Sequence, residues 1–142
     1  MKLSARSRYA TRILVILAEN KGTVVNTTSL SEQTGISVQF IEQIIRPLKQ
    51  GGLVTSTRGV TGGHTLASPP SGISLGDVVR AIEGPIDLTQ CCDGEAAALC
   101  PRKQECPTRP AWLQVSGILE NALDNISIAD LLTPPPHLAA FA

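Results

Sequence analysis

The sequence predicts a mainly α-helical fold with one small β-wing, and three observations lead to this expectation. Apolar residues recur at helical spacing between residues 9 and 48 and again after residue 108. Two short segments suited to strands flank a glycine-rich stretch between residues 53 and 67. Of the 142 residues, 42% are hydrophobic and only 17% are charged, so the apolar side chains suffice for the core of about one domain.

The first helix is expected to begin after Ser4, whose side chain can accept a hydrogen bond from a backbone N–H of the first turn. Its apolar stripe covers residues 9–17, while Arg8 and Arg12 face outward. Gly22 follows its end.

A helix, a turn and a second helix are expected next. Thr28 can cap a short helix that reaches Thr34. Gly35 can then make the turn, and Ser37 can cap a longer amphipathic helix. Pro47 lies inside this longer helix, so we expect a kink or an early end there, because proline removes a helical hydrogen bond.

A β-wing is expected to follow this pair of helices. Residues 53–56 and 64–67 suit two short strands, and residues 57–63 between them are rich in glycine and carry Arg58. Together these elements predict a winged helix-turn-helix unit.

The C-terminal half is expected to hold two further helices around an irregular loop. Ser74 and Asp77 match a capping box at the start of a connecting helix. Thr108 can cap a long amphipathic helix reaching about Asn125, which we interpret as a dimerisation helix, with packing on its own domain as the alternative. The predicted regions are 1–68, the DNA-binding unit; 69–86, the connecting helix; 87–107, the cysteine loop; 108–132, the dimerisation helix and a short terminal helix; and 133–142, a flexible tail.

The charges are divided unevenly along the chain. Residues 1–66 carry eight basic and three acidic side chains, whereas the remainder carries four basic and nine acidic ones. The N-terminal half is therefore basic, although the formal net charge of the whole chain is zero. A basic region favours a polyanion such as DNA, because each neutralised phosphate releases a counterion. Ordinary solvated basic side chains are the alternative.

The second helix of a helix-turn-helix enters the major groove of DNA, and its outward side chains reach base edges. Gln can pair with adenine, Glu can accept from cytosine and Phe can contact a thymine methyl group, whereas an arginine on a wing suits a narrow minor groove. The alternative is a solvated polar helix face. The candidate DNA-binding residues are Ser37, Gln39, Phe40, Glu42, Gln43, Arg46 and Arg58.

All four cysteines lie in the cysteine loop, at Cys91, Cys92, Cys100 and Cys106. Thiolates favour iron–sulfur clusters and zinc. The spacing lacks the C-x-x-C steps of ferredoxins, zinc ribbons and thioredoxin-like motifs. We expect a metal site here, with unligated thiols as the alternative, and with one of the two adjacent cysteines outside the ligand set.

Several short motifs together resemble the IscR/NsrR/CymR group of Rrf-type bacterial regulators, over nearly the whole chain to Leu132. They are Met-Lys-Leu-Ser at the start, Arg8-Tyr9-Ala10, Gly35-Ile36-Ser37, Glu42-Gln43, Gly52-Leu53-Val54, Arg58-Gly59 with Gly62-Gly63, and Cys106 followed by Trp112.

This resemblance implies a homodimer of winged-helix subunits joined by the long C-terminal helix. It also implies iron–sulfur, nitric oxide or redox sensing through a cluster. It places Ser37 to Gln43 on the recognition helix and Arg58 on the wing. Cys100 and Cys106 match the second and third cluster cysteines, and the first is either Cys91 or Cys92.

Two positions depart from the pattern of the group. Arg109 stands where IscR-like members carry a histidine ligand, and Arg8 stands where NsrR-like members carry an acidic one. A guanidinium group cannot act as a ligand. The fourth ligand is therefore open among the spare cysteine, Asp93, Glu95, a small molecule and solvent.

The sequence is interpreted as a cytoplasmic, homodimeric transcription regulator, a repressor that binds a double-stranded DNA operator and is controlled by a 2Fe-2S or 4Fe-4S cluster. No apolar run approaches the roughly 20 residues of a membrane span. One alternative keeps the DNA function and replaces the cluster with zinc or thiol oxidation. A small iron–sulfur electron-transfer protein or thiol redox protein is disfavoured, and no catalytic Ser/His/Asp or Cys/His arrangement indicates an enzyme.

Overall fold

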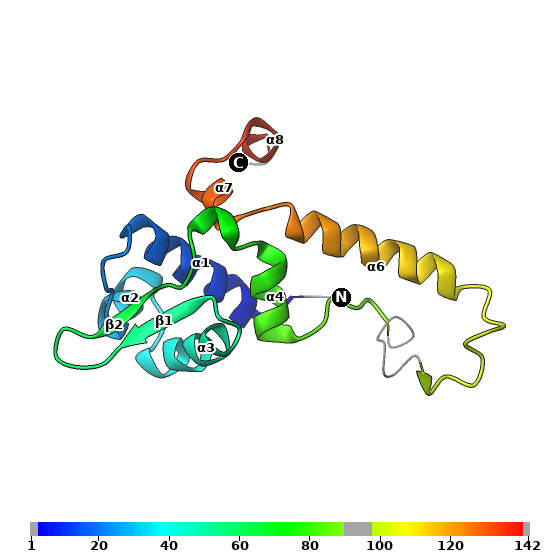
Figure 1. Cartoon of the computed structure of the whole chain (residues 1–142), viewed down its shortest axis with the longest axis horizontal. Helices are drawn as coiled ribbons and strands as arrows, with labels where there is room; N and C mark the ends of the chain where they lie inside the picture. Colours follow the sequence, from blue (N-terminus) through cyan, green and yellow to red (C-terminus); the bar gives the residue numbers. More distant parts are fainter. Residues whose placement is uncertain (1–2, 90–97, 141–142) are drawn as a thin grey trace.

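A computed structural model describes residues 3–89 and 98–140. It is mainly helical, with one two-stranded antiparallel sheet (Figure 1). The described elements are α1 (Ala5–Glu19), α2 (Thr27–Thr34), α3 (Val38–Gln50), β1 (Val54–Thr57), β2 (Gly63–Leu66), the 3-10 helix η1 (Pro70–Gly72), α4 (Leu75–Glu83), α6 (Arg109–Asp124), α7 (Ile128–Leu132) and α8 (Pro136–Ala139).

The first three helices begin at polar caps, two of which the sequence predicted. The side chains of Ser4 and Ser37 accept hydrogen bonds from backbone N–H groups of α1 and α3. The cap predicted at Thr28 is wrong, because Asn26 caps α2 and accepts a hydrogen bond from the Ser29 N–H at 2.8 Å. Gly35 ends α2 in the left-handed conformation, with φ of 72°, as the predicted turn requires.

The early end predicted at Pro47 is also wrong, because α3 continues to Gln50, whereas the kink stays a prediction. Proline cannot donate to the carbonyl four residues earlier, which belongs to Gln43. That carbonyl oxygen accepts a hydrogen bond from the Arg6 guanidinium of α1 at 3.1 Å. A neighbouring helix thus satisfies the acceptor that the proline leaves free.

The wing is an antiparallel hairpin held against the start of α2. Val54 pairs with Leu66, and Thr57 pairs with Gly63. Two backbone hydrogen bonds, of 3.0 and 2.8 Å, also join His64 to Val25, just before α2. Gly63 permits this approach, since a Cβ there would lie 2.6 Å from the Val25 carbonyl carbon.

Helix α1 lies at the centre of the core and packs against α2, α3, β2, α4 and α7. Its buried side is uncharged and extends from Ser7 to Ala18. The largest fully buried side chains come from five helices and the segment just before α4: Ile13, Leu14, Leu17, Leu30, Ile41, Ile44, Leu48, Ile73, Val78 and Ile128. The recognition helix α3 is therefore fixed through its apolar side, and its polar side faces outward.

Helix α6 projects away from this core in Figure 1, and its C-terminal part contacts α4. Arg80 of α4 forms ion pairs with Glu120 at 3.1 Å and with Asp124 at 2.5 Å. The predicted side-chain cap at Thr108 is not formed. Along α6, large apolar side chains are exposed: Trp112, Leu113, Val115 and Ile118.

The capping box at Ser74 and Asp77 is present and begins α4. A second capping box joins Ser127 and Asp130 at the start of α7. A short helix, α8, occupies part of the region that the sequence predicted as a tail. Within residues 3–89 and 98–140, no helix is long and apolar enough to cross a membrane.

Candidate nucleic-acid interface

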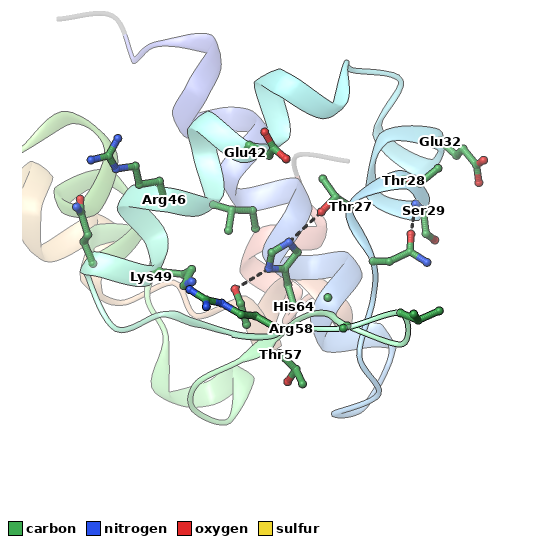
Figure 2. A pocket seen from close by; sticks show the side chains of 18 residues that line it. Thr27, Thr28, Ser29, Glu32, Glu42, Arg46, Lys49, Thr57, Arg58 and His64 are labelled. Carbon is green, nitrogen blue, oxygen red and sulfur yellow. Dashed lines mark hydrogen bonds between the residues drawn. The ribbon is translucent and has the colours of Figure 1, made fainter.

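A groove of about 1060 Å³ lies between α2, α3 and the wing (Figure 2). We call it the recognition groove. The start of α2 forms one wall, the side of α3 that carries Glu42, Arg46 and Lys49 forms another, and the hairpin forms the third. Its lining residues are Asn26, Thr27, Thr28, Ser29, Glu32, Glu42, Ile45, Arg46, Lys49, Gln50, Ser56, Thr57, Arg58, Gly59, Val60, Gly62, Gly63 and His64.

Basic side chains outnumber acidic ones in the recognition groove. Arg46 and Lys49 come from α3, and Arg58 comes from the wing. Glu42 of α3 and Glu32 of α2 are the two carboxylates of the lining. The three cations can neutralise phosphates, and an exposed Glu42 can accept from a base amino group.

The start of α2 contributes three hydroxyl groups to the same groove, on Thr27, Thr28 and Ser29. Hydroxyl side chains, backbone N–H groups and helix N-termini are common phosphate contacts in protein–DNA complexes. Sequence reasoning missed these residues, because Thr28 was assigned to the cap of α2. The true cap, Asn26, shifts all three into the first turn of the helix.

The ring of His64, a residue of β2, reaches both α2 and β1 (Figure 2), and both of its nitrogens are hydrogen-bonded. Nε2 is 3.2 Å from the Thr27 hydroxyl, and Nδ1 is 2.8 Å from the Ser56 hydroxyl. Partial burial, and then the positive charge of Lys49, lower the pKa of His64 from its usual value near 6.5, while Glu42 acts in the opposite direction. The ring is therefore biased toward its neutral form in the free protein.

The structure places the predicted DNA-binding residues in two groups. Glu42, Arg46 and Arg58 line the recognition groove. Ser37, Gln39 and Gln43 are exposed near the start of α3 and do not line it. Phe40 differs from the expectation of an outward side chain, because it is half-buried and packs edge-on against Tyr9, with ring centroids 5.9 Å apart.

The cysteine loop is described only in part. Cys91, Cys92, Asp93 and Glu95 lie outside the described residues, whereas Cys100 and Cys106 are partly exposed free thiols. In the described part of the chain, no three metal-ligating side chains lie together.

Cys106 lies just before α6 and has a polarised environment. The Thr108 hydroxyl, 3.4 Å from Sγ, and the backbone N–H groups of Thr108 and Arg109 lower the pKa of the Cys106 thiol. Among the described residues, the buried Nε of Arg109 has no hydrogen-bond partner. Both features favour a negative charge at this end of the loop.

The recognition helix, the glycine turn and the wing around a cation-lined groove define a winged helix-turn-helix DNA-binding protein. The chain belongs to the Rrf2 family, whose model, described as an iron-dependent transcriptional regulator, matches residues 3–134. It is thus a transcriptional regulator and not an enzyme, as the names of its relatives also indicate.

Three curated relatives match nearly the whole chain. The protein rrf2 of Nitratidesulfovibrio vulgaris is 38% identical over 136 residues, covering 93% of this chain and 87% of its own. The regulator CymR of Bacillus subtilis is 33% identical, covering 92% and 89%. The regulator IscR of Vibrio parahaemolyticus is 32% identical, covering 94% and 78%.

Two solved structures share the fold. The structure of CymR, described as the global cysteine regulator of B. subtilis, has a TM-score of 0.76 and 29% identity, covering 95% of this chain and 98% of its own. The structure of IscR from T. potens has a TM-score of 0.69 and 31% identity, covering 93% and 86%. The resemblance stated from the sequence motifs is confirmed at the level of the family and the fold.

Proposed function

We propose that the protein is a homodimeric repressor that binds a double-stranded operator in the cytoplasm through its recognition groove. We further propose that an iron–sulfur cluster held by the cysteine loop controls its affinity for DNA. The observation that carries the DNA function is the recognition groove itself. It brings Arg46, Lys49 and Arg58 together with the exposed carboxylate of Glu42 between a recognition helix and a wing.

The roles of the groove residues follow from their chemistry. Arg46, Lys49 and the hydroxyls of α2 hold the DNA backbone, which fixes the register of the protein on the duplex. Glu42 reads a base edge from α3, and Arg58 enters the adjacent minor groove from the wing. Ser37, Gln39 and Gln43 extend the reading surface toward the start of α3.

The exposed apolar side chains of α6 support the homodimer. Trp112 and Val115 are 44% and 47% exposed, and Ile118 is 61% exposed. Leaving such a row in water forgoes the burial of apolar surface, which contributes about 25 cal/mol per Å². A second α6 from a partner subunit can cover this row and set the distance between two recognition helices.

The chemistry of the described donors fits an anionic thiolate-bound cluster. The pKa of the Cys106 thiol is lowered, and the Arg109 Nε, which has no partner among the described residues, can donate to a sulfur acceptor. Cys100, Cys106 and one of Cys91 and Cys92 would hold the cluster, which supplies sensitivity to iron, nitric oxide or oxidants. Arg109 itself cannot ligate, so its role would be that of a hydrogen-bond donor.

The loop is connected to the recognition helix through described contacts. Glu83, at the end of α4, accepts hydrogen bonds from the Ser4 N–H at 3.0 Å, from the Ser4 hydroxyl and from the Ser7 hydroxyl. Arg6, in the same first turn of α1, binds the Gln43 carbonyl of α3. A change in the loop that begins after α4 can therefore alter the position of α3.

A second candidate keeps the DNA function and uses thiol oxidation in place of a cluster. The lowered pKa of the Cys106 thiol favours it, because the thiolate is the form that oxidants attack. Zinc in the same loop is the remaining metal alternative.

The test is an absorption spectrum with iron and acid-labile sulfide analysis on protein purified without oxygen. We expect broad visible bands and matching amounts of iron and sulfide. Operator affinity is then measured at fixed salt on the loaded protein, on the emptied protein and on a Cys106→Ser variant. Equal affinities for loaded and emptied protein would contradict control by the cluster. A colourless protein that stays empty after reconstitution would transfer the sensing role to zinc or to the thiols.

A further inference from the structure

His64 is the one member of the recognition groove that joins α2 to both strands of the wing. Its backbone is hydrogen-bonded to Val25, just before α2. Its ring is bonded to Thr27 of α2 and to Ser56 of β1. A single residue therefore fixes how the wing lies relative to the start of α2.

The two ring bonds constrain the hydroxyl groups of Thr27 and Ser56. A neutral imidazole has one N–H and one bare nitrogen, so one of the two hydroxyls must donate its proton to the ring. A protonated imidazole donates from both nitrogens, and both hydroxyls then accept. Protonation thus keeps both bonds to the ring and frees the one hydroxyl proton that the neutral ring had accepted, so that both hydroxyl protons can then point elsewhere.

Thr27, Ser56 and His64 all line the recognition groove. A DNA phosphate in this part of the groove would be an acceptor for the two hydroxyl protons. Its negative charge would also favour the protonated ring. Phosphate binding and protonation of the His64 ring therefore favour each other.

We propose that His64 is a positioning residue of the DNA interface, which takes up a proton when a DNA phosphate enters the groove and thereby leaves both the Thr27 and the Ser56 hydroxyl free to donate to that phosphate. The proposal rests on DNA binding by the recognition groove. It adds that operator binding by this chain is coupled to proton uptake at a stated residue.

The surroundings of the His64 ring favour its neutral form in the free protein. On α3, Lys49 opposes protonation and Glu42 favours it, with the burial of the ring as the larger effect. Arg46 of α3, Glu32 of α2 and Arg58 of the wing line the same groove. Helix α1, which packs against β2, has only uncharged residues on its buried side. A bound phosphate adds the negative charge that reverses this balance.

The test uses the full chain and a duplex that it selects from a random-sequence library. Affinity is measured by fluorescence anisotropy from pH 6 to pH 8 at constant ionic strength. We expect binding of wild-type protein to be about threefold to tenfold tighter at pH 6 for each engaged subunit, because one proton bound gives at most a tenfold change per pH unit.

Two variants isolate the contribution of His64. His64→Gln retains a donor and an acceptor for the two hydroxyls but does not titrate, so it should lose the pH dependence whatever its affinity at pH 8. His137→Gln replaces the other histidine, which lies in α8, and should keep the wild-type profile.

A second measurement is made on the wild-type protein and therefore does not depend on the folding of a His64 variant. The ring resonances of His64 in the wild-type protein, assigned by comparison with His137→Gln, are titrated with and without the duplex. The midpoint for His64 should move to higher pH when DNA is bound. An unchanged midpoint, or equal pH profiles for wild type and His64→Gln, would overturn the proposal and leave DNA binding intact. If the selection enriches no duplex over random DNA, DNA binding by the groove fails, and the proposal fails with it.

Discussion

Replacing Gly63 with alanine should separate the wing from α2. A Cβ at this position would lie 2.6 Å from the Val25 carbonyl carbon and 2.8 Å from the Asn26 nitrogen, and closer still to the Val25 oxygen. All three are backbone atoms, so no side chain can rotate away. The hairpin must therefore move, which breaks the two backbone hydrogen bonds between Val25 and His64.

The expected loss follows from these bonds and the added strain. Two backbone hydrogen bonds contribute about 1 kcal/mol each, and displacement of His64 also weakens its bond to Thr27, so Gly63→Ala should cost about 2–4 kcal/mol. Urea unfolding followed by circular dichroism measures it. Gly72→Ala is the matched control, because a Cβ there meets nothing within 4 Å, and it should change stability by less than about 0.5 kcal/mol. Equal stabilities for the two variants would refute the close approach of the wing to α2.

Further substitutions test the remaining parts of the account. Ile118→Glu places a charge in the exposed row of α6 and should give monomers in sedimentation, whereas Val60→Glu, at a fully exposed position of the wing, should not. A dimer in both would exclude α6 as the interface. Glu42→Ala should reduce the preference for the correct base by about 1–3 kcal/mol, and Arg58→Ala should weaken binding mainly at A·T-rich sites. If either variant lost as much affinity for random DNA as for the selected site, its proposed role would be contradicted. Hydrogen bonds from Ser4 and Ser7 lower the pKa of Glu83 in the folded protein. The stability that this carboxylate contributes is therefore present above its unfolded pKa near 4.3, and it is lost as the pH falls through the lower folded value. Glu83→Gln should weaken the dependence of stability on acid pH, and an unchanged acid-unfolding midpoint would contradict the bridge from α4 to α1.

Local signals predicted much of the fold. The caps at Ser4, Ser37 and Ser74 and the glycine turn at Gly35 depend on a few neighbouring residues, so they could be identified from the sequence. The wing strands begin and end within about one residue of the expected positions, because the glycine-rich connection limits where they can lie.

Features that depend on distant residues could not be predicted. Pro47 is tolerated because Arg6, on another helix, binds the carbonyl that the proline leaves free. His64 was assigned only to the wing, and nothing local indicates that its ring bridges Thr27 and Ser56. The cap of α2 was misplaced because Asn26 and Thr28 are both good capping residues, and tertiary packing decides between them.

The most direct test of the central claim compares the affinity of the full chain for its selected duplex with that for a scrambled duplex, across a series of salt concentrations. The account predicts at least about 1000-fold preference for the selected duplex and a steep loss of affinity with salt on both. Arg46→Ala should reduce the salt slope on both duplexes, whereas Glu42→Ala should reduce the preference. Equal affinity for the two duplexes, or binding that is insensitive to salt, would contradict sequence-specific DNA recognition by the groove between α2, α3 and the wing.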